Sequence, residues 1–223
     1  QFQPGFTHWG SFAEYVAINY AEQNLVGLPE TMSFEEAASL GCRFITSFRA
    51  LADQGKLSAG QTIAIFGCGG VGLSAILIAR ALGATIIAVD IDHHKLELAK
   101  QLGADFVLNA NRESQLTEQI FDISDGGCHL AIDALGSSLT AVQSIKSLRK
   151  RGKHIQVGLM TGPDAMAAMP MDLVIARELE IIGSHGMPAV RYEAVFELLQ
   201  SNNINLKSMI QTELNLEEGF NIL

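Results

Sequence analysis

Cysteine, tryptophan and basic side chains are scarce in this 223-residue chain. Its three cysteines (Cys42, Cys68 and Cys128) are far apart and form no C-x-x-C pair, which argues against a disulfide framework and for a reducing, cytoplasmic setting. The 15 basic residues against 24 acidic ones give a net charge of -9, which disfavours nucleic acid as a partner. Charged residues reach only 17% and hydrophobic residues 48%, so a packed globular protein is expected.

One stretch of the chain carries no charge at all. Residues 57–79 are uncharged over 23 positions, which is long enough to span a bilayer. Five clustered glycines interrupt the stretch, an arrangement not expected of a membrane-spanning helix. We therefore interpret it as a buried strand, a tight turn and a buried helix, and expect no membrane partner.

Short apolar strands alternate with helices along most of the chain. Strands are predicted at residues 12–18, 62–66, 85–90, 106–108, 130–134, 154–157 and 180–182. Helices are predicted at residues 33–40, 44–54, 71–82, 92–102, 113–123, 138–148, 171–177 and 190–200. This alternation predicts an α/β fold in which helices cover both faces of a doubly wound parallel sheet, a Rossmann architecture.

The turn between the strand at 62–66 and the next helix reads G-C-G-G-V-G and matches the dinucleotide-binding pattern G-x-G-x-x-G in its required context. Gly67 permits the tight turn, Gly69 lets a pyrophosphate approach the backbone, and Gly72 lets the helix pack closely. Gly70 and Val71 open a helix whose N-terminus favours phosphate. All five are candidate cofactor-binding residues.

An acidic residue follows this turn at the expected distance. Asp90 ends the next strand, 23 residues after Gly67, where a carboxylate accepts the hydroxyls of an adenosine ribose and repels a 2'-phosphate. NAD is therefore predicted over NADP. The alternative is that Asp90 only caps the following helix. Lys95 lies one turn further on, where contact with the same ribose and a solvated surface position are equally consistent with the sequence.

Three later loops also follow predicted strands. They hold Leu135 and Gly136, then Val157 and Gly158, and finally Ser184. Open α/β sheets bind ligands at the carboxyl ends of their strands, so these residues are candidates for contacts with the other half of the dinucleotide.

Taken in order, GCRFITSFRAL, KLSAGQTIAIFGCGGVG and IAVDIDHHK resemble the zinc-dependent medium-chain alcohol dehydrogenases. The resemblance covers essentially the whole chain and is specific between Gly41 and Lys95. It implies that Cys42 is a ligand of a catalytic zinc and that Thr46 packs behind the nicotinamide ring. It also implies hydride transfer between an alcohol and NAD, with the metal as Lewis acid and an alcohol, aldehyde or ketone as substrate.

The sequence departs from the family pattern at both ends. The G-H-E motif and the cysteine-rich lobe of the family have no match here. We therefore expect residues 1–41 to be a remnant of a catalytic domain, 42–185 an NAD-binding domain, and 186–223 a truncated return segment. The resemblance further implies a homodimer or homotetramer built on the sheet edge near 180–182. This chain alone is expected to bind NAD without being active, since Cys42 lacks partner ligands.

Three other functions share parts of this pattern. A zinc-free quinone or enone reductase would leave Cys42 incidental and would commonly use NADPH, against the indication from Asp90. A methyltransferase using S-adenosylmethionine also places a glycine turn and an acid on a doubly wound sheet. A non-catalytic NAD-sensing module is the third.

Overall fold

The computed structural model describes residues 5, 7–111, 115–210 and 212–220. Its contacts divide the chain into two compact units. One unit runs from Cys42 to Met187, and the other joins Gln1–Gly41 to Pro188–Leu223.

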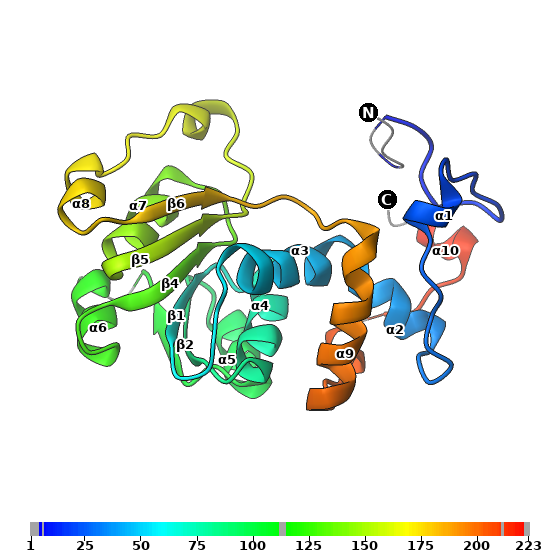
Figure 1. Ribbon diagram of the computed structural model, residues 1–223, viewed down its shortest axis with the longest axis horizontal. Helices are drawn as coiled ribbons and strands as arrows, with labels where there is room; N and C mark the ends of the chain where they lie inside the picture. The colour runs from blue at the N-terminus through cyan, green and yellow to red at the C-terminus, as the bar shows by residue number, and fades with distance from the viewer. Residues whose placement is uncertain (1–4, 6, 112–114, 211, 221–223) are drawn as a thin grey trace. The chain divides into compact units, whose positions relative to one another are not determined.

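The larger unit is built on a six-stranded parallel sheet in the order β3-β2-β1-β4-β5-β6 (Figure 1). The strands are β1 (Thr62–Phe66), β2 (Thr85–Asp90), β3 (Phe106–Asn109), β4 (Cys128–Asp133), β5 (Leu148–Gln156) and β6 (Glu180–Gly183). Strand order reverses between β1 and β4, which confirms the predicted doubly wound fold. Ligand crevices form beyond the carboxyl ends of the strands at such a reversal.

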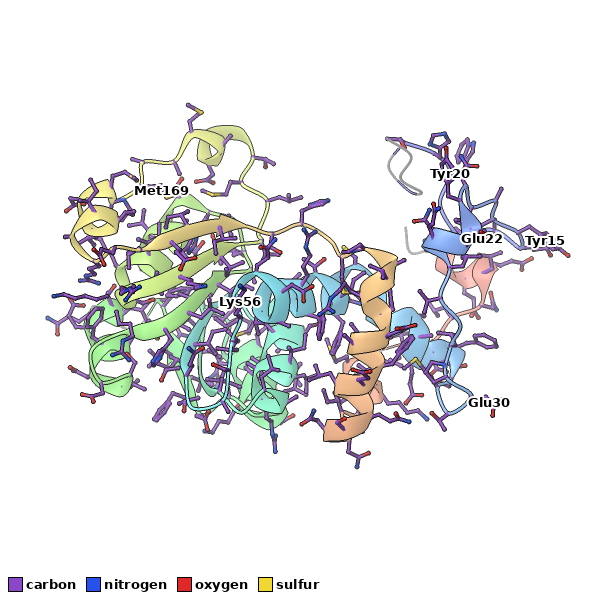
Figure 2. All side chains as sticks on the ribbon, in the orientation of Figure 1. Tyr15, Tyr20, Glu22, Glu30, Lys56 and Met169 are labelled. Atoms are coloured by element: carbon purple, nitrogen blue, oxygen red, sulfur yellow. The ribbon has the colours of Figure 1, made fainter. Side chains whose placement is uncertain are left out.

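Helices pack on the sheet because its strands are apolar on both faces. On one face, alternate strand residues such as Ala64, Phe66 and Ile87 join α6 (Leu116–Ile123) and α7 (Ser138–Lys146) in one buried cluster. Met169 is partly buried against this cluster (Figure 2).

The other large helices of this unit are α4 (Gly70–Ala81) and α5 (His93–Leu102). They contact each other, and α4 contacts β1 and β2 (Figure 1). The smaller helices are α3 (Ile45–Phe48) and α8 (Met171–Ala176).

Helix boundaries follow local capping signals. Asp92 caps α5 by accepting the backbone N–H of His94 at 2.9 Å, and Gly103 ends the helix with a φ of 116°. In α2 (Phe34–Ser39), a capping box forms because Ser33 and Glu36 accept each other's backbone N–H. Both helices lie within their predicted ranges, 33–40 and 92–102.

Two elements of the larger unit differ from their predicted forms. Strand β5 starts at Leu148, well before the predicted residue 154, because Leu148 already pairs with Cys128 on β4. A bulge then separates this pair from the Leu130–Lys153 pair. The helix predicted at 44–54 is present, but its turns are π-helical over Leu40–Phe44 and Arg49–Gln54 on either side of α3. The predicted helix start at Glu113 lies outside the described residues, and α6 begins at Leu116.

The strand predicted at residues 12–18 is wrong. No residue of this stretch is assigned to a strand, and Tyr15, labelled in Figure 2, is 90% exposed. An alternating apolar pattern becomes a strand only when another strand pairs with its backbone, and none does so among the described residues. The helices of this smaller unit are α1 (Ala21–Asn24), α2, α9 (Tyr192–Asn202) and α10 (Leu216–Phe220).

Nowhere in the part of the chain that the structure describes is a helix both long and apolar enough to cross a membrane. The uncharged stretch is divided between β1, the glycine turn and the 12-residue α4, as predicted.

Candidate functional site

The glycine turn between β1 and α4 is fitted to its neighbours at two positions and open at a third. Gly67 has a φ of +93°, and a Cβ there would lie 3.3 Å from the backbone nitrogen of Leu135. A Cβ on Gly72 would overlap the carbonyl oxygen of Gly67, so only glycine lets α4 start this close to the turn. At Gly69 a Cβ would meet no atom within 4 Å. The exposed backbone there leaves room for a ligand.

Asp90 braces this turn. Its carboxylate accepts the backbone N–H of Cys68 at 2.7 Å with one oxygen and that of Asp92 at 2.9 Å with the other. Because Asp92 is the residue that caps α5, the capping alternative for Asp90 is wrong. A carboxylate oxygen has lone pairs beyond the one used by each amide, so Asp90 retains acceptor capacity for ribose hydroxyls.

Lys95 is exposed in the first turn of α5. Both Asp90 and Lys95 act on the Cys68 thiol: burial, reinforced by the Asp90 charge, raises the pKa of Cys68 to about 12, and Lys95 opposes the rise. Asp90 and Lys95, the two charged candidates for contact with the ribose, therefore both lie close to the glycine turn.

The remaining cofactor candidates lie at the carboxyl ends of β4, β5 and β6. A cavity of about 450 Å³ is lined by Val157, Gly158 and Ser184 together with Arg49 and Gln156. The Ser184 hydroxyl is buried and has no hydrogen-bond partner among the described residues. A buried hydroxyl without a partner is costly, which suits a site that a polar ligand completes.

Leu135 and Gly136 form the loop after β4. The Leu135 side chain is 62% exposed, and Gly136 has a φ of +92°. A Cβ on Gly158 would overlap Gly136, so the loops after β4 and β5 touch through their backbones. The structure thus brings the predicted residues of these two loops together. The open backbone at Gly69 and the unpartnered Ser184 hydroxyl fit a dinucleotide.

Cys42 and Thr46 precede the sheet. Cys42 lies in the first π-helical segment and is exposed, whereas Thr46 is buried in α3. Within residues 5, 7–111, 115–210 and 212–220, no group of three histidine, cysteine or acidic side chains is placed to hold a metal. Cys42 alone does not fit a zinc site, since such a site needs three or four protein ligands.

The three thiols are expected to differ sharply in reactivity. Burial raises the pKa of both Cys68 and Cys128 to about 12, while Cys42 is exposed. In the native chain at pH 8, a maleimide or disulfide reagent is therefore expected to label one thiol per chain rapidly, and all three after denaturation. Mass spectrometry of the labelled peptides checks the assignment. Rapid native labelling of Cys68 would contradict this burial.

Three residues at the site were not found from the sequence. Arg43 lies against Gly70, because a Cβ on Gly70 would overlap the Arg43 side chain. Asp133 and Gln156 end β4 and β5 and hold the loops that follow. Asp133 offered a usable signal, since it ends a strand as Asp90 does. Arg43 directly follows Cys42, but nothing local indicates which way it points.

The Ser47 hydroxyl joins the Arg43 segment to the glycine turn. It lies 2.9 Å from the carbonyl oxygen of Arg43 and 2.8 Å from that of Val71. Arg43 is thereby held beside the first turn of α4, where it adds a positive charge.

Comparison with known proteins matches the chain from the first residue of α4 onward. The family model described as zinc-binding dehydrogenase matches residues 70–201. The chain belongs to the zinc-binding dehydrogenase family. The family membership confirms the resemblance seen in the sequence and agrees with the Rossmann sheet.

Several alcohol dehydrogenases are similar over most of the chain. An alcohol dehydrogenase of Geobacillus stearothermophilus is 36% identical over 81% of this chain and 51% of its own length. An NAD-dependent alcohol dehydrogenase of Sulfurisphaera tokodaii is 35% identical over 96% of this chain and 60% of its own. The solved alcohol dehydrogenase TADH from Thermus sp. ATN1 superposes with a TM-score of 0.86 at 29% identity, over 96% of this chain and 62% of its own. The chain therefore spans between half and two thirds of the length of these proteins.

Proposed function

We propose that this chain is the NAD-binding part of an alcohol dehydrogenase that transfers a hydride between an alcohol and NAD. The observation that carries the proposal is the Asp90 carboxylate bound to the Cys68 amide beside the open backbone at Gly69. A hydrogen-bond acceptor for the ribose hydroxyls thus lies next to exposed backbone that a phosphate group can reach. The names of the similar dehydrogenases support the same activity.

Each part of the site has a task in this proposal. The first turn of α4 has Gly69 as its N-cap, which has no side chain to occupy the helix N-terminus, so those amides receive the diphosphate. Asp90 and Lys95 orient the ribose.

At the other end of the cofactor, the loops at Leu135, Gly136, Val157, Gly158 and Ser184 surround the nicotinamide, with Thr46 behind the ring. When bound, NAD supplies the acceptor for the hydride.

Zinc enters only as a proposal about Cys42. We propose Cys42 as one zinc ligand, but the described residues supply no set of ligands that completes a metal site. We also propose a homodimer or homotetramer formed through β6, one of the two edge strands of the sheet. The proposed substrate is a small alcohol, aldehyde or ketone, and the proposed location is the cytoplasm.

Calorimetric titration of the chain with NAD, NADP and S-adenosylmethionine in parallel tests the function. NAD is expected to bind at least about tenfold more tightly than NADP, a difference of about 1.4 kcal/mol. Equal binding of NAD and NADP would count against the role of Asp90 and favour a reductase. Binding of S-adenosylmethionine alone would overturn the proposal.

Arg43 is expected to strengthen cofactor binding through its charge. Arg43→Gln should weaken NAD about tenfold, the effect of losing one charge-assisted hydrogen bond of about 1.5 kcal/mol. The loss should shrink as salt rises, because salt screens an exposed charge. Arg80→Gln, the same change in the last turn of α4, is the control and should leave NAD affinity unchanged. An Arg43 effect that is equal at low and high salt would contradict the electrostatic role.

A further inference from the structure

A buried network of hydrogen-bonded polar side chains lies behind the loops proposed to surround the nicotinamide. It begins at Asp133, which is fully buried at the end of β4. One Asp133 oxygen accepts the backbone N–H of Leu135 at 2.9 Å and that of Gly136 at 3.0 Å. The other accepts the side-chain amide of Gln156 at 3.0 Å. The buried carboxylate thus has three donors, as its burial requires.

Gln156 connects this carboxylate to the other two loops. Its amide nitrogen donates to Asp133 and also to the carbonyl oxygen of Gly158 at 2.9 Å, which uses both N–H bonds. Its own backbone carbonyl accepts the N–H of Ser184 at 3.0 Å. The backbone carbonyl of Asp133 accepts the N–H of Gly158 at 2.8 Å. Asp133 and Gln156 together therefore hold all three loops.

The orientation of Gln156 is in turn determined by His154. Because the amide nitrogen of Gln156 faces two acceptors, its amide oxygen is the atom that lies 3.0 Å from Nε2 of His154. An amide oxygen only accepts, so Nε2 of His154 must carry the proton. Nδ1 is then an acceptor for the hydroxyl of Ser144 on α7, 2.8 Å away. Burial lowers the pKa of His154, which favours the neutral ring, and the two hydrogen bonds select this tautomer.

We propose that Gln156, oriented by His154 and Ser144, is a positioning residue that aligns the three loops around the nicotinamide half of the cofactor. The inference rests on the proposed function. It assigns Gln156 no contact with the reacting atoms. The loops after β4 and β5 touch through backbone atoms at Gly136 and Gly158, so a shift in one is passed to the other. Gly67 packs against Leu135, but the amide of Cys68 is held by Asp90 and not by these loops, so that amide should not respond.

Two ligands separate a positioning role from a general structural one. NAD contains both halves of the site's ligand, whereas ADP-ribose lacks the nicotinamide. Gln156→Met keeps the side-chain length but removes the donors to Asp133 and Gly158. It should weaken NAD about tenfold, as expected from losing a hydrogen bond at a buried acceptor, and leave ADP-ribose within about twofold. Gln101→Met, the same change at an exposed position of α5, is the control and should alter neither affinity.

Hydrogen exchange of the free chain tests the positioning itself. In Gln156→Met the amides of Leu135, Gly136 and Ser184 should exchange faster, while the amide of Cys68 at the glycine turn should not. If Gln156→Met fails to fold, His154→Leu replaces it, since it removes only the group that orients Gln156 and should change the same amides to a smaller extent.

Each outcome decides between the two claims. Equal losses for NAD and ADP-ribose, or unchanged exchange at the three loops, would overturn the inference while leaving the proposed function standing. A wild-type chain that binds both ligands equally would also overturn it, because the loops would then contribute nothing to affinity. If the wild-type chain binds neither ligand, the proposed function itself fails.

Discussion

Gly72→Ala is expected to abolish NAD binding at micromolar concentrations and to lower the stability of the larger unit. The added methyl group would overlap the carbonyl oxygen of Gly67, a backbone atom that no change of side-chain rotamer can move away. Relief requires α4 to move away from the turn, although its Ala75, Ile76 and Ile78 are fully buried. Overpacking of this kind costs about 2 kcal/mol. Loss of two hydrogen bonds from α4 to a diphosphate corresponds to about a hundredfold in affinity.

Two alanine variants serve as controls for this prediction. Gly27→Ala makes the same change where a Cβ meets no atom within 4 Å and should alter neither stability nor binding. Gly69→Ala also has free space and should keep the melting temperature, but it should weaken NAD because its methyl group occupies the proposed phosphate approach. Thermal unfolding by circular dichroism and calorimetric titration give the two readouts. Wild-type stability in Gly72→Ala would refute the predicted overlap.

Asp90→Asn is expected to lower the preference for NAD over NADP by between about tenfold and a hundredfold. The substitution keeps the shape of the side chain and removes the charge that repels a 2'-phosphate. Two like charges 4 Å apart near a protein surface repel each other by about 4 kcal/mol. The expected change in cofactor preference corresponds to only part of that repulsion energy. NAD itself should bind less tightly, because an amide cannot accept from both Cys68 and Asp92 with equal strength.

The control for this variant lies two residues away. Asp92→Asn makes the same change at the cap of α5, where asparagine is an equally good N-cap, and it should leave both affinities unchanged. Parallel titrations with NAD and NADP at fixed salt measure the ratio for each variant. An unchanged ratio in Asp90→Asn would show that another group selects the cofactor.

Local signals in the sequence were sufficient for the parts of the fold that depend on near neighbours. The capping groups of α2 and α5, the glycine turn and the apolar strands β1 and β2 are each determined within a few residues. The strand predicted at residues 12–18 failed because strands also need a partner, and a partner is not a local property. The bulge in β5 was missed for the same reason, and the π-helical turns at Leu40–Phe44 and Arg49–Gln54 were not predicted either.

By itself, then, the amino-acid sequence determined a doubly wound sheet, a dinucleotide turn after its first strand and an acid at the end of the second. Only the tertiary structure decided that Asp90 holds the amide of Cys68, that Arg43 covers Gly70, and that Gln156 joins Asp133 to the loop at Gly158. These contacts join residues that are separated by up to 27 positions in the chain, or that depend on which way a side chain turns. Strand register and helix packing bring such groups together, and neither can be read from a run of neighbouring residues.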